Sequence, residues 1–508
     1  MIRYSILFLL SILWVVAGCS SRPDPKTVVM DIEFSPTNLD PRVGTDAQSE
    51  FIDELLFDSL VRKDQNFNLV PGAAERWEIP DPRTYIFHLR RGIRFHDGRP
   101  LTARDVKWTL DSMRDGSLRT IKGATYNLVD RVDMPDDFTL VVHLKEPFAP
   151  LLWNLSEGAF GIVPFGSGKD FKNNPIGSGP FRFVLSDPDS QVVIARNDNY
   201  WGERPRVERI RFAVIPDDTT RALELRKGSA DLAPANSFPP DMVGTLAQQR
   251  NLVVQRHPGT SLAYLAFNLR DPILKDVRVR QAVAYAIDRQ AILHYLLRDS
   301  GRLAANVLPP EHWAYDPGVT AYSYDPDKAN SLLDAAGYPR GQDGIRLHLT
   351  MKTSTVESAR LFASVLQQQL RVVGIDLHIR TYEFATFYSD VTKGAFQLYS
   401  LRWIGYSNQD PDIFEDAFHS ASFAPKRANR GYYSNPEVDS LIEEGRRTVD
   451  VEQRKRIYAR VQQILSHDLP YFNLWYLDNV LVHSSRVSNV ALGASADYQF
   501  LNTVELAR

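Results

Sequence analysis

The chain has 508 residues, of which 44% are hydrophobic and 24% are charged, and its formal net charge is -3. This length predicts two or three domains instead of one core. The basic residues are spread along the chain, without the patch or stripe that would indicate nucleic-acid binding. The single cysteine excludes an internal disulfide and any zinc site built on paired cysteines.

The N-terminal residues predict export. Arg3 precedes an apolar run from Ile6 to Val16, and a helix of about 11 residues spans roughly 17 Å, too short for a bilayer core of about 30 Å. Residues 1–18 are therefore interpreted as a signal peptide. The small residues before Cys19 resemble the lipobox of bacterial lipoproteins, which implies lipidation of Cys19 and a lipidated tether over residues 19–26. The alternative is an ordinary secretory signal with an incidental cysteine.

The first elements after the tether are predicted from alternation and spacing. Residues 27–34 indicate a strand, and the polar turn that follows contains Pro and Asp, which a plain strand-to-loop connection would explain. Residues 51–60 have helical spacing. Alternating apolar residues at 85–89 and again at 93–95, on either side of Gly92, predict a β-hairpin.

A helix is predicted to begin after Thr102. Asp105 follows it by three residues, as in a capping box, and Val106, Leu110 and Met113 continue on one face. The segment before it, His96-Asp97, offers residue types that can catalyse, but the Asp-Gly turn and the helix cap already account for these residues.

The second half of the chain alternates strands and helices, which predicts a separate α/β lobe. Residues 262–268 read as a strand, residues from Asp276 onward as an amphipathic helix, and Asp288 as the cap of another helix. Further predicted elements are helices at 326–336, 357–373, 437–447 and 451–466, and strands at 375–379, 397–403 and 469–482.

Two of these stretches carry a resemblance. VRQAVAYAIDR at Val279–Arg289 and DGRPLTARDV at Asp97–Val106 closely resemble signature segments of the family 5 extracellular solute-binding proteins of ABC transporters. The strand ending in Phe267-Asn268 matches the segment in which that family crosses between its lobes. The resemblance runs from about residue 27 to about residue 490, with its signatures in the expected order.

The resemblance implies an α/β, two-lobed periplasmic-binding-protein fold (class II, large type) with an extra subdomain in the first lobe. The expected boundaries are 27–45, 175–262 and 475–508 for the main subdomain of lobe I, 46–174 for its extra subdomain, and 263–474 for lobe II.

The resemblance also implies a ligand site between the lobes, where members bind solutes by hinged closure. Phe34 and Ser35 are expected to line it from the first strand and turn. Arg402, Trp403 and Ile404 match the strand that peptide-binding members pair with the peptide backbone. The alternative for Trp403 is core packing of a large aromatic side chain.

One position departs from the pattern of peptide binders. Three residues after the matched Trp, where they carry an Asp that pairs with the ligand ammonium, this chain has Tyr406. Asp410 is the nearest candidate to replace that Asp; alternatively it only holds the Asp-Pro turn.

No motif of a hydrolase, metalloprotease, nucleotide-binding loop or redox centre is present. We therefore expect a non-enzymatic, monomeric, lipid-anchored extracytoplasmic protein without cofactor or metal, which captures peptides and delivers them to ABC permease subunits. Its contact with the membrane would be the lipid anchor alone, and no nucleic acid is expected as a partner. The alternatives are the same fold with another solute, such as a nickel complex, haem, a sugar or an opine, a secreted hydrolase, or a purely structural lipoprotein.

Overall fold

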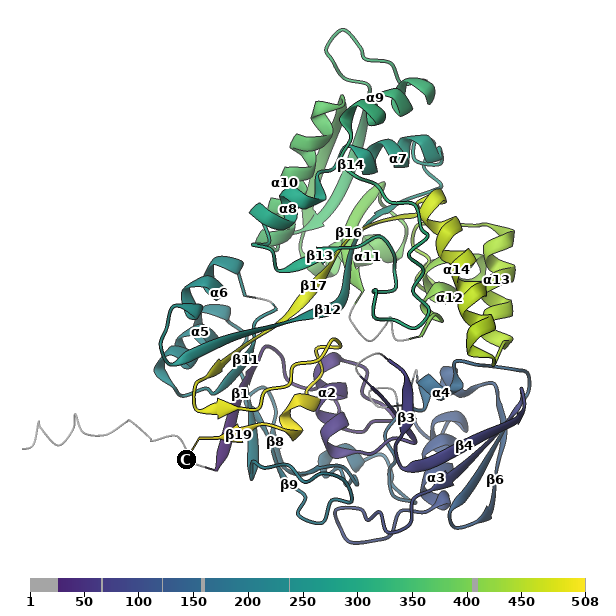
Figure 1. Ribbon diagram of the computed structural model, residues 1–508, viewed down its shortest axis with the longest axis vertical. Coiled ribbons are helices and arrows are strands. Elements are labelled where there is room, and N and C mark those ends of the chain that lie inside the picture. The colour runs from purple at the N-terminus through teal and green to yellow at the C-terminus, as the bar shows by residue number, and fades with distance from the viewer. Residues whose placement is uncertain are drawn as a thin grey trace, which may run out of the picture.

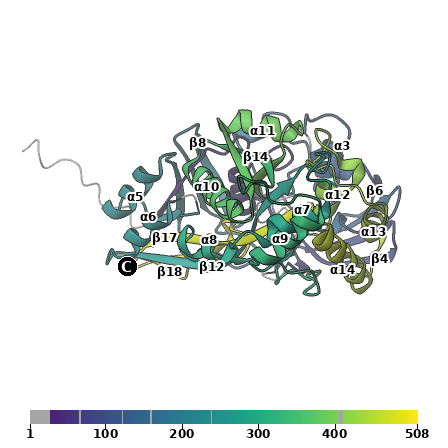
Figure 2. The same cartoon turned by 90° about the horizontal axis from the view of Figure 1, so that it is seen from above.

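The computed structural model describes residues 26–64, 67–120, 122–156, 160–236, 238–403 and 410–507. This part of the chain forms a mixed α/β fold of two lobes stacked along the long axis (Figure 1). Seen from above, the molecule is flattened, with α5 (Asp218–Lys227) and α6 (Pro240–Ala247) at one end and α13 (Pro436–Arg447) and α14 (Val451–Asp468) at the other (Figure 2).

One eleven-stranded sheet runs through both lobes. Its order is β15 (Ile375–Tyr382), β14 (Leu347–Ser354), β16 (Leu398–Trp403), β12 (Leu252–Phe267), β17 (Tyr471–Ser484), β11 (Leu232–Pro234), β1 (Thr27–Ile32), β10 (Arg209–Val214), β9 (Gln191–Arg196) and β8 (Phe181–Asp187), with β13 (Gly301–Leu303) beside β17. Short pairs join β2 (Val61–Lys63) to β3 (Leu69–Pro71) and β18 (Val487–Ser488) to β19 (Glu505–Leu506).

The long strands β12 and β17 connect the lobes. The first part of β12 pairs with residues 479–484, next to β11, and its second part pairs with residues 471–477, next to β16. The pairing is irregular between His257 and Ser261, and a side chain on Gly259 would collide with the Leu477 carbonyl oxygen at 2.2 Å. The two lobes are thus joined through a tightly packed β-bulge.

Helix caps predicted from the sequence are confirmed. The Asp276 carboxylate accepts a hydrogen bond at the start of α7 (Val277–Tyr285), and Asp288 does the same for α8 (Arg289–Tyr295). Thr102 and Asp105 form the predicted capping box of α3 (Ala103–Arg114). Other helices are α2 (Ala47–Leu56), α4 (Leu151–Asn154), α9 (Pro326–Ala335), α10 (Glu357–Val372), α11 (Phe384–Thr392) and α12 (Ile413–Phe418).

The predicted hairpin over residues 85–95 is wrong. β5 (Thr84–Leu89) pairs instead with β4 (Ala74–Asp81) and β7 (Thr139–Leu144), and β6 (Val129–Asp136) completes this four-stranded sheet. Alternation identified the strand but not its partner. The turn that sets the pairing lies before β5, where the Arg83 N–H donates to the Asp81 carboxylate, an Asx-type turn.

Separate apolar cores fill the lobes. The four-stranded sheet and α3 enclose their own cluster, whereas α2 packs through Phe51, Ile52 and Leu55 into the cluster beneath β1 and β10. Lobe II has a cluster on each face of its sheet. We propose from this packing that α2 belongs with the main subdomain of lobe I, and the other predicted boundaries stay predictions.

Among the described residues, no helix is both long and apolar enough to cross a membrane. The predicted signal peptide, Cys19, Ile404 and Tyr406 lie outside the described residues.

Candidate ligand-binding site between the lobes

The end of β1 presents an exposed aromatic side chain. Phe34 lies two residues past the end of β1 and is 60% exposed, unusual for a side chain of this size beside a buried strand. The next residue, Ser35, accepts a hydrogen bond from the Asp189 N–H at 3.4 Å, which connects it to the turn between β8 and β9. Both predicted site residues of lobe I therefore lie just beyond the carboxyl end of β1.

The end of β16 presents Arg402 and Trp403. In the pairing with β12, Arg402 lies opposite Ala263 and Trp403 opposite Leu262. Alternation along a strand places their side chains on opposite faces. Trp403 is half-buried, and its indole N–H has no acceptor within the described residues.

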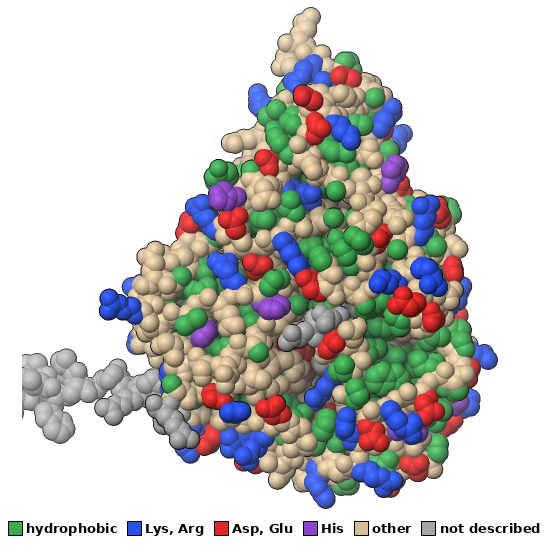
Figure 3. Space-filling view, viewed as in Figure 1, with side chains coloured by type: hydrophobic (Ala, Val, Ile, Leu, Met, Phe, Trp, Pro, Cys, Tyr) green, Lys and Arg blue, Asp and Glu red, His purple; other side chains and the backbone are tan. Residues whose placement is uncertain are grey.

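The charge of Glu33, just past the end of β1, acts on Arg402. The Arg402 side chain is exposed to solvent, yet burial within the surrounding protein lowers its pKa, and the charge of Glu33 acts in the opposite direction. Figure 3 shows a hollow near the centre of this face, between the lobes. We call this hollow the recess, and we infer from the charge of Glu33 acting on Arg402 that the ends of β1 and β16 border it.

An aromatic wall lies behind Trp403. Its ring stacks on Tyr264, with centroids 6.2 Å apart, and Tyr264 stacks on Tyr471 at 4.3 Å. The guanidinium of Arg430 lies 5.7 Å from the Trp403 ring and donates to the Tyr388 hydroxyl at 3.1 Å. This wall offers a second cation and flat apolar surfaces beside β16.

Asp410 has a partner that the sequence did not suggest. Arg454 of α14 donates to both of its carboxylate oxygens, at 2.9 and 3.0 Å, and the Asp412 N–H also donates to it. Burial alone would lower the pKa of Arg454, but the Asp410 charge raises it above its ordinary value. A carboxylate held in this way has little capacity left for a ligand ammonium.

Close to this pair, lobe II touches the extra subdomain. The Arg454 guanidinium lies 5.1 Å from the ring of Trp153 and 5.4 Å from that of Trp313, and the two indoles stack with centroids 5.8 Å apart. Nearby, the Ala149 N–H donates to the Arg446 carbonyl at 2.8 Å. We call Trp153, Trp313 and Arg454 the interlobe clasp. It lies opposite the crossing strands (Figure 1), and hydrophobic side chains gather over β3, β4 and α4 beside it (Figure 3).

His96 has a structural position. Its Nδ1 accepts from the Gly177 N–H at 3.1 Å, and Nε2 lies 3.2 Å from the Gly179 carbonyl oxygen. Burial lowers its pKa to about 4, so the ring is neutral at neutral pH. It secures the glycine turn, in which a side chain on Gly177 would meet the Leu56 carbonyl oxygen at 1.8 Å.

The structure thus places Phe34 and Ser35 just beyond the end of β1, places Arg402 and Trp403 at the end of β16 with their side chains on opposite faces, and places Asp410 in the pair beside the clasp. Their roles in ligand binding stay predictions. Sequence reasoning missed Arg430 and the clasp. The alternation of residues 262–268 would have placed Tyr264 on the face of Leu262, but no local pattern connects Trp153 with Trp313, which are far apart in the chain.

Two α/β lobes joined by crossing strands, with a hollow between them, are typical of solute-binding proteins. The family described as "Bacterial extracellular solute-binding proteins, family 5 Middle" matches residues 68–425. The chain belongs to this family, which confirms the resemblance seen in the sequence.

Similar proteins cover nearly the whole chain. The dipeptide-binding protein of Escherichia coli (strain K12) is 29% identical over 474 residues, 88% of either chain. The structure of NikZ from Campylobacter jejuni in complex with Ni(L-His) matches with a TM-score of 0.80 and 26% identity, over 95% of this chain and 99% of that one. DppA from Helicobacter pylori in complex with the peptide STSA matches with a TM-score of 0.78 and 26% identity, over 95% and 98%.

Proposed function

We propose that this chain captures short peptides between its lobes and delivers them to an ABC importer. The observation that carries the proposal is that the charge of Glu33, just past the end of β1, acts on Arg402, at the end of β16. These two strand ends belong to different lobes, and the family membership makes the space between them the expected ligand site. The similarity to peptide-binding relatives supports a peptide as the solute.

The chemistry of the recess fits a ligand with a carboxylate. Arg402 supplies a guanidinium group able to form paired hydrogen bonds to a carboxylate, and Arg430 supplies another beside Trp403, on the other face of β16. The half-buried ring of Trp403 and the exposed ring of Phe34 offer apolar contact to side chains of varied size. A peptide ligand would gain affinity from backbone hydrogen bonds and little selectivity from such surfaces.

We propose that Asp410 acts on structure and not on the ligand. The bidentate hydrogen bonds from Arg454 already satisfy its charge. A peptide ammonium then needs another partner, because an unpaired buried charge costs several kcal/mol. Glu33 is the carboxylate whose charge acts on Arg402, and we propose it for this role.

A second candidate ligand is a metal–amino acid chelate. The similarity to the protein solved with Ni(L-His) favours it, and the same guanidinium groups would bind the amino acid carboxylates. Nickel would travel as cargo inside such a ligand.

We further propose that the protein is exported, lipidated at Cys19, monomeric, and held at the membrane by lipid alone while it serves permease subunits. The lone cysteine after a short apolar run supports this. We expect binding and release without chemical change of the ligand, which is consistent with a solute-binding family and with the structural position of His96. Replacing Cys19 with Ser should release the protein from membranes, and unchanged membrane association would contradict lipidation.

The ligand proposal is tested by calorimetric titration with di- and tripeptides in three forms: free, N-acetylated and C-amidated. We expect free peptides to bind, C-amidation to weaken binding to wild type, and Arg402→Gln to remove much of that difference. The Asp410→Asn variant should discriminate N-acetylated from free peptides as wild type does. Equal binding of all three forms by wild type would contradict recognition of peptide termini.

A further inference from the structure

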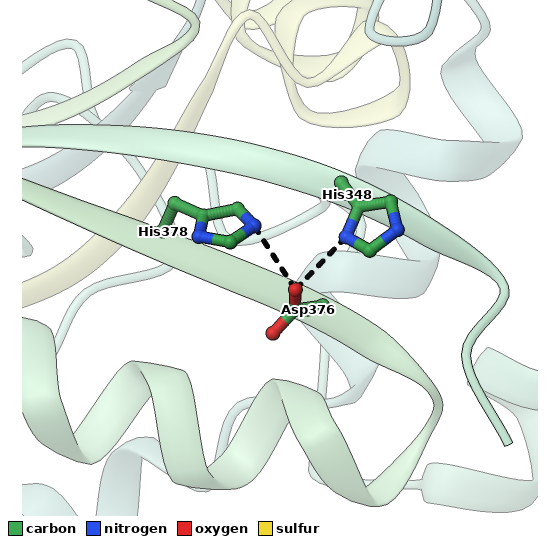
Figure 4. Close-up of side chains that lie close together, drawn as sticks. All are labelled: His348, Asp376 and His378. Atoms are coloured by element: carbon green, nitrogen blue, oxygen red, sulfur yellow. Dashed lines mark hydrogen bonds and ion pairs between the residues drawn. The ribbon is translucent and has the colours of Figure 1, made fainter. Parts of the chain in front are cut away.

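A cluster of metal-ligand side chains lies outside the recess, on the sheet of lobe II. His348 of β14 stands directly opposite Asp376 of β15, and His378 follows Asp376 by two residues on the same face. The Asp376 Oδ2 lies 2.8 Å from His348 Nδ1 and 3.0 Å from His378 Nε2. Figure 4 shows both imidazoles turned toward this carboxylate. One donor atom from each residue lies within 4.8 Å of the others.

The cluster is on a rigid support and is open to solvent. The alternate residues of both strands are buried against α10 in the lobe II core, so the strands hold the three side chains on the opposite face. The side chains of His348 and His378 are 64% and 61% exposed, and that of Asp376 is 26% exposed. An ion can therefore reach the cluster without any opening of the core.

The geometry points to a transition-metal site, and we propose that His348, Asp376 and His378 bind one divalent ion of the Zn²⁺ type. Two donors on a tetrahedral Zn²⁺ with bonds of about 2.1 Å lie about 3.4 Å apart. The Asp376 oxygen lies 2.8 and 3.0 Å from the two imidazole nitrogens. Small side-chain rotations that move each imidazole away from this oxygen would bring these distances to about 3.4 Å. Two imidazoles and a carboxylate match Zn²⁺, Ni²⁺ or Cu²⁺ and not Mg²⁺ or Ca²⁺, which prefer sets of oxygen ligands.

The site is separate from the proposed ligand recess. β14 and β16 are parallel and pair Met351 with Leu398, so His348 lies near the start of its strand whereas Trp403 ends its own. Along the strand direction, this register places His348 about eight residues, or roughly 25 Å, from Trp403. A metal bound at the cluster is thus a second occupant of the protein, and its binding does not depend on which solute the recess takes.

The test is calorimetric titration of the tag-free full chain with ZnCl₂, compared with the double variant His348→Gln/His378→Gln. We expect one saturable equivalent for wild type and a loss of affinity of roughly tenfold or more in the double variant, since two of three ligands are gone. The control His294→Gln removes an exposed histidine that contacts Asp299 and Tyr295, outside the cluster, and it should bind Zn²⁺ as wild type does. CaCl₂ should give no saturable binding.

A second measurement locates the ion. Crystals soaked in ZnCl₂ should show anomalous density at the zinc edge between the two imidazoles and Asp376. Absence of saturable zinc binding, equal affinity in the double variant, or anomalous density only elsewhere would each overturn the proposal. Because all three side chains are partly or largely exposed, the variants are expected to fold, and unchanged melting temperatures without metal check this.

Discussion

Asp410 and Arg454 form a buried ion pair with two hydrogen bonds, in which the side chains are 9% and 1% exposed. The pair holds the segment that precedes α12 against the first turn of α14. It also holds the Arg454 guanidinium against the indoles of Trp153 and Trp313, which stack on each other. One carboxylate thereby positions a cation that contacts both lobes.

The first prediction concerns this pair. Asp410→Asn leaves the charge of Arg454 buried without its partner, and breaking a buried pair in this way costs about 3–5 kcal/mol in the free energy of unfolding. The matched control is Asp416→Asn, which breaks an exposed pair with Arg427 and should cost about 1 kcal/mol or less. Urea denaturation measures both. A loss for Asp410→Asn no larger than that of the control would show that the pair does not stabilise the fold.

The second prediction concerns the interlobe clasp. Trp153→Ala removes the ring that stacks on Trp313 across the lobes, and an aromatic pair contributes about 0.5–1.5 kcal/mol. We expect ligand affinity to fall about threefold to tenfold and the radius of gyration of the ligand-bound protein to increase in solution scattering. Trp153→Phe keeps a ring at this position and should recover much of the effect. An unchanged radius and affinity in Trp153→Ala would mean that the clasp does not hold the lobes together.

The third prediction concerns Asp31 in β1. Burial raises the pKa of Asp31 to about 7, and the charge of Glu224 adds to the shift. The unfolded carboxyl ionises near pH 4, so between about pH 4 and 7 the folded state holds the proton more tightly, and the stability contributed by this group falls as pH rises. Asp31→Asn should therefore stabilise the protein by about 1–3 kcal/mol more at pH 8 than at pH 5. Denaturation of both proteins at the two pH values measures the difference between their free energies of unfolding. A difference that is the same at both pH values would contradict the prediction.

Much of the fold was predictable because its signals are local. Asp276 and Asp288 stand before apolar periodic segments, and each caps a helix as expected. The family signatures at 97–106 and 279–289 gave the lobed architecture. The partner of β5 was missed because alternation does not specify which strand pairs with it. The helix over residues 51–60 ends at Leu56, where Phe57 adopts extended backbone angles, although the apolar spacing continues.

The site was only partly predictable, for a related reason. The sequence gives Trp403 and Phe34 as candidates, but their approach depends on how the two lobes meet. Asp410 shows the limit most directly, since its partner Arg454 is 44 residues away. From the sequence alone, Asp410 could be interpreted as a partner of a ligand ammonium or as part of a local turn, because no local pattern indicates a distant arginine.

The central claim is that a peptide binds between the ends of β1 and β16. Native mass spectrometry of the protein purified from cells grown in peptide-rich medium tests it most directly. We predict that wild type carries bound masses that are released on denaturation and fragment as short peptides, and that the double variant Arg402→Gln/Trp403→Ala loses them while keeping its fold. A wild-type protein that carries no peptide under these conditions and binds none when peptides are added, or a double variant that carries the same peptides, would contradict the claim.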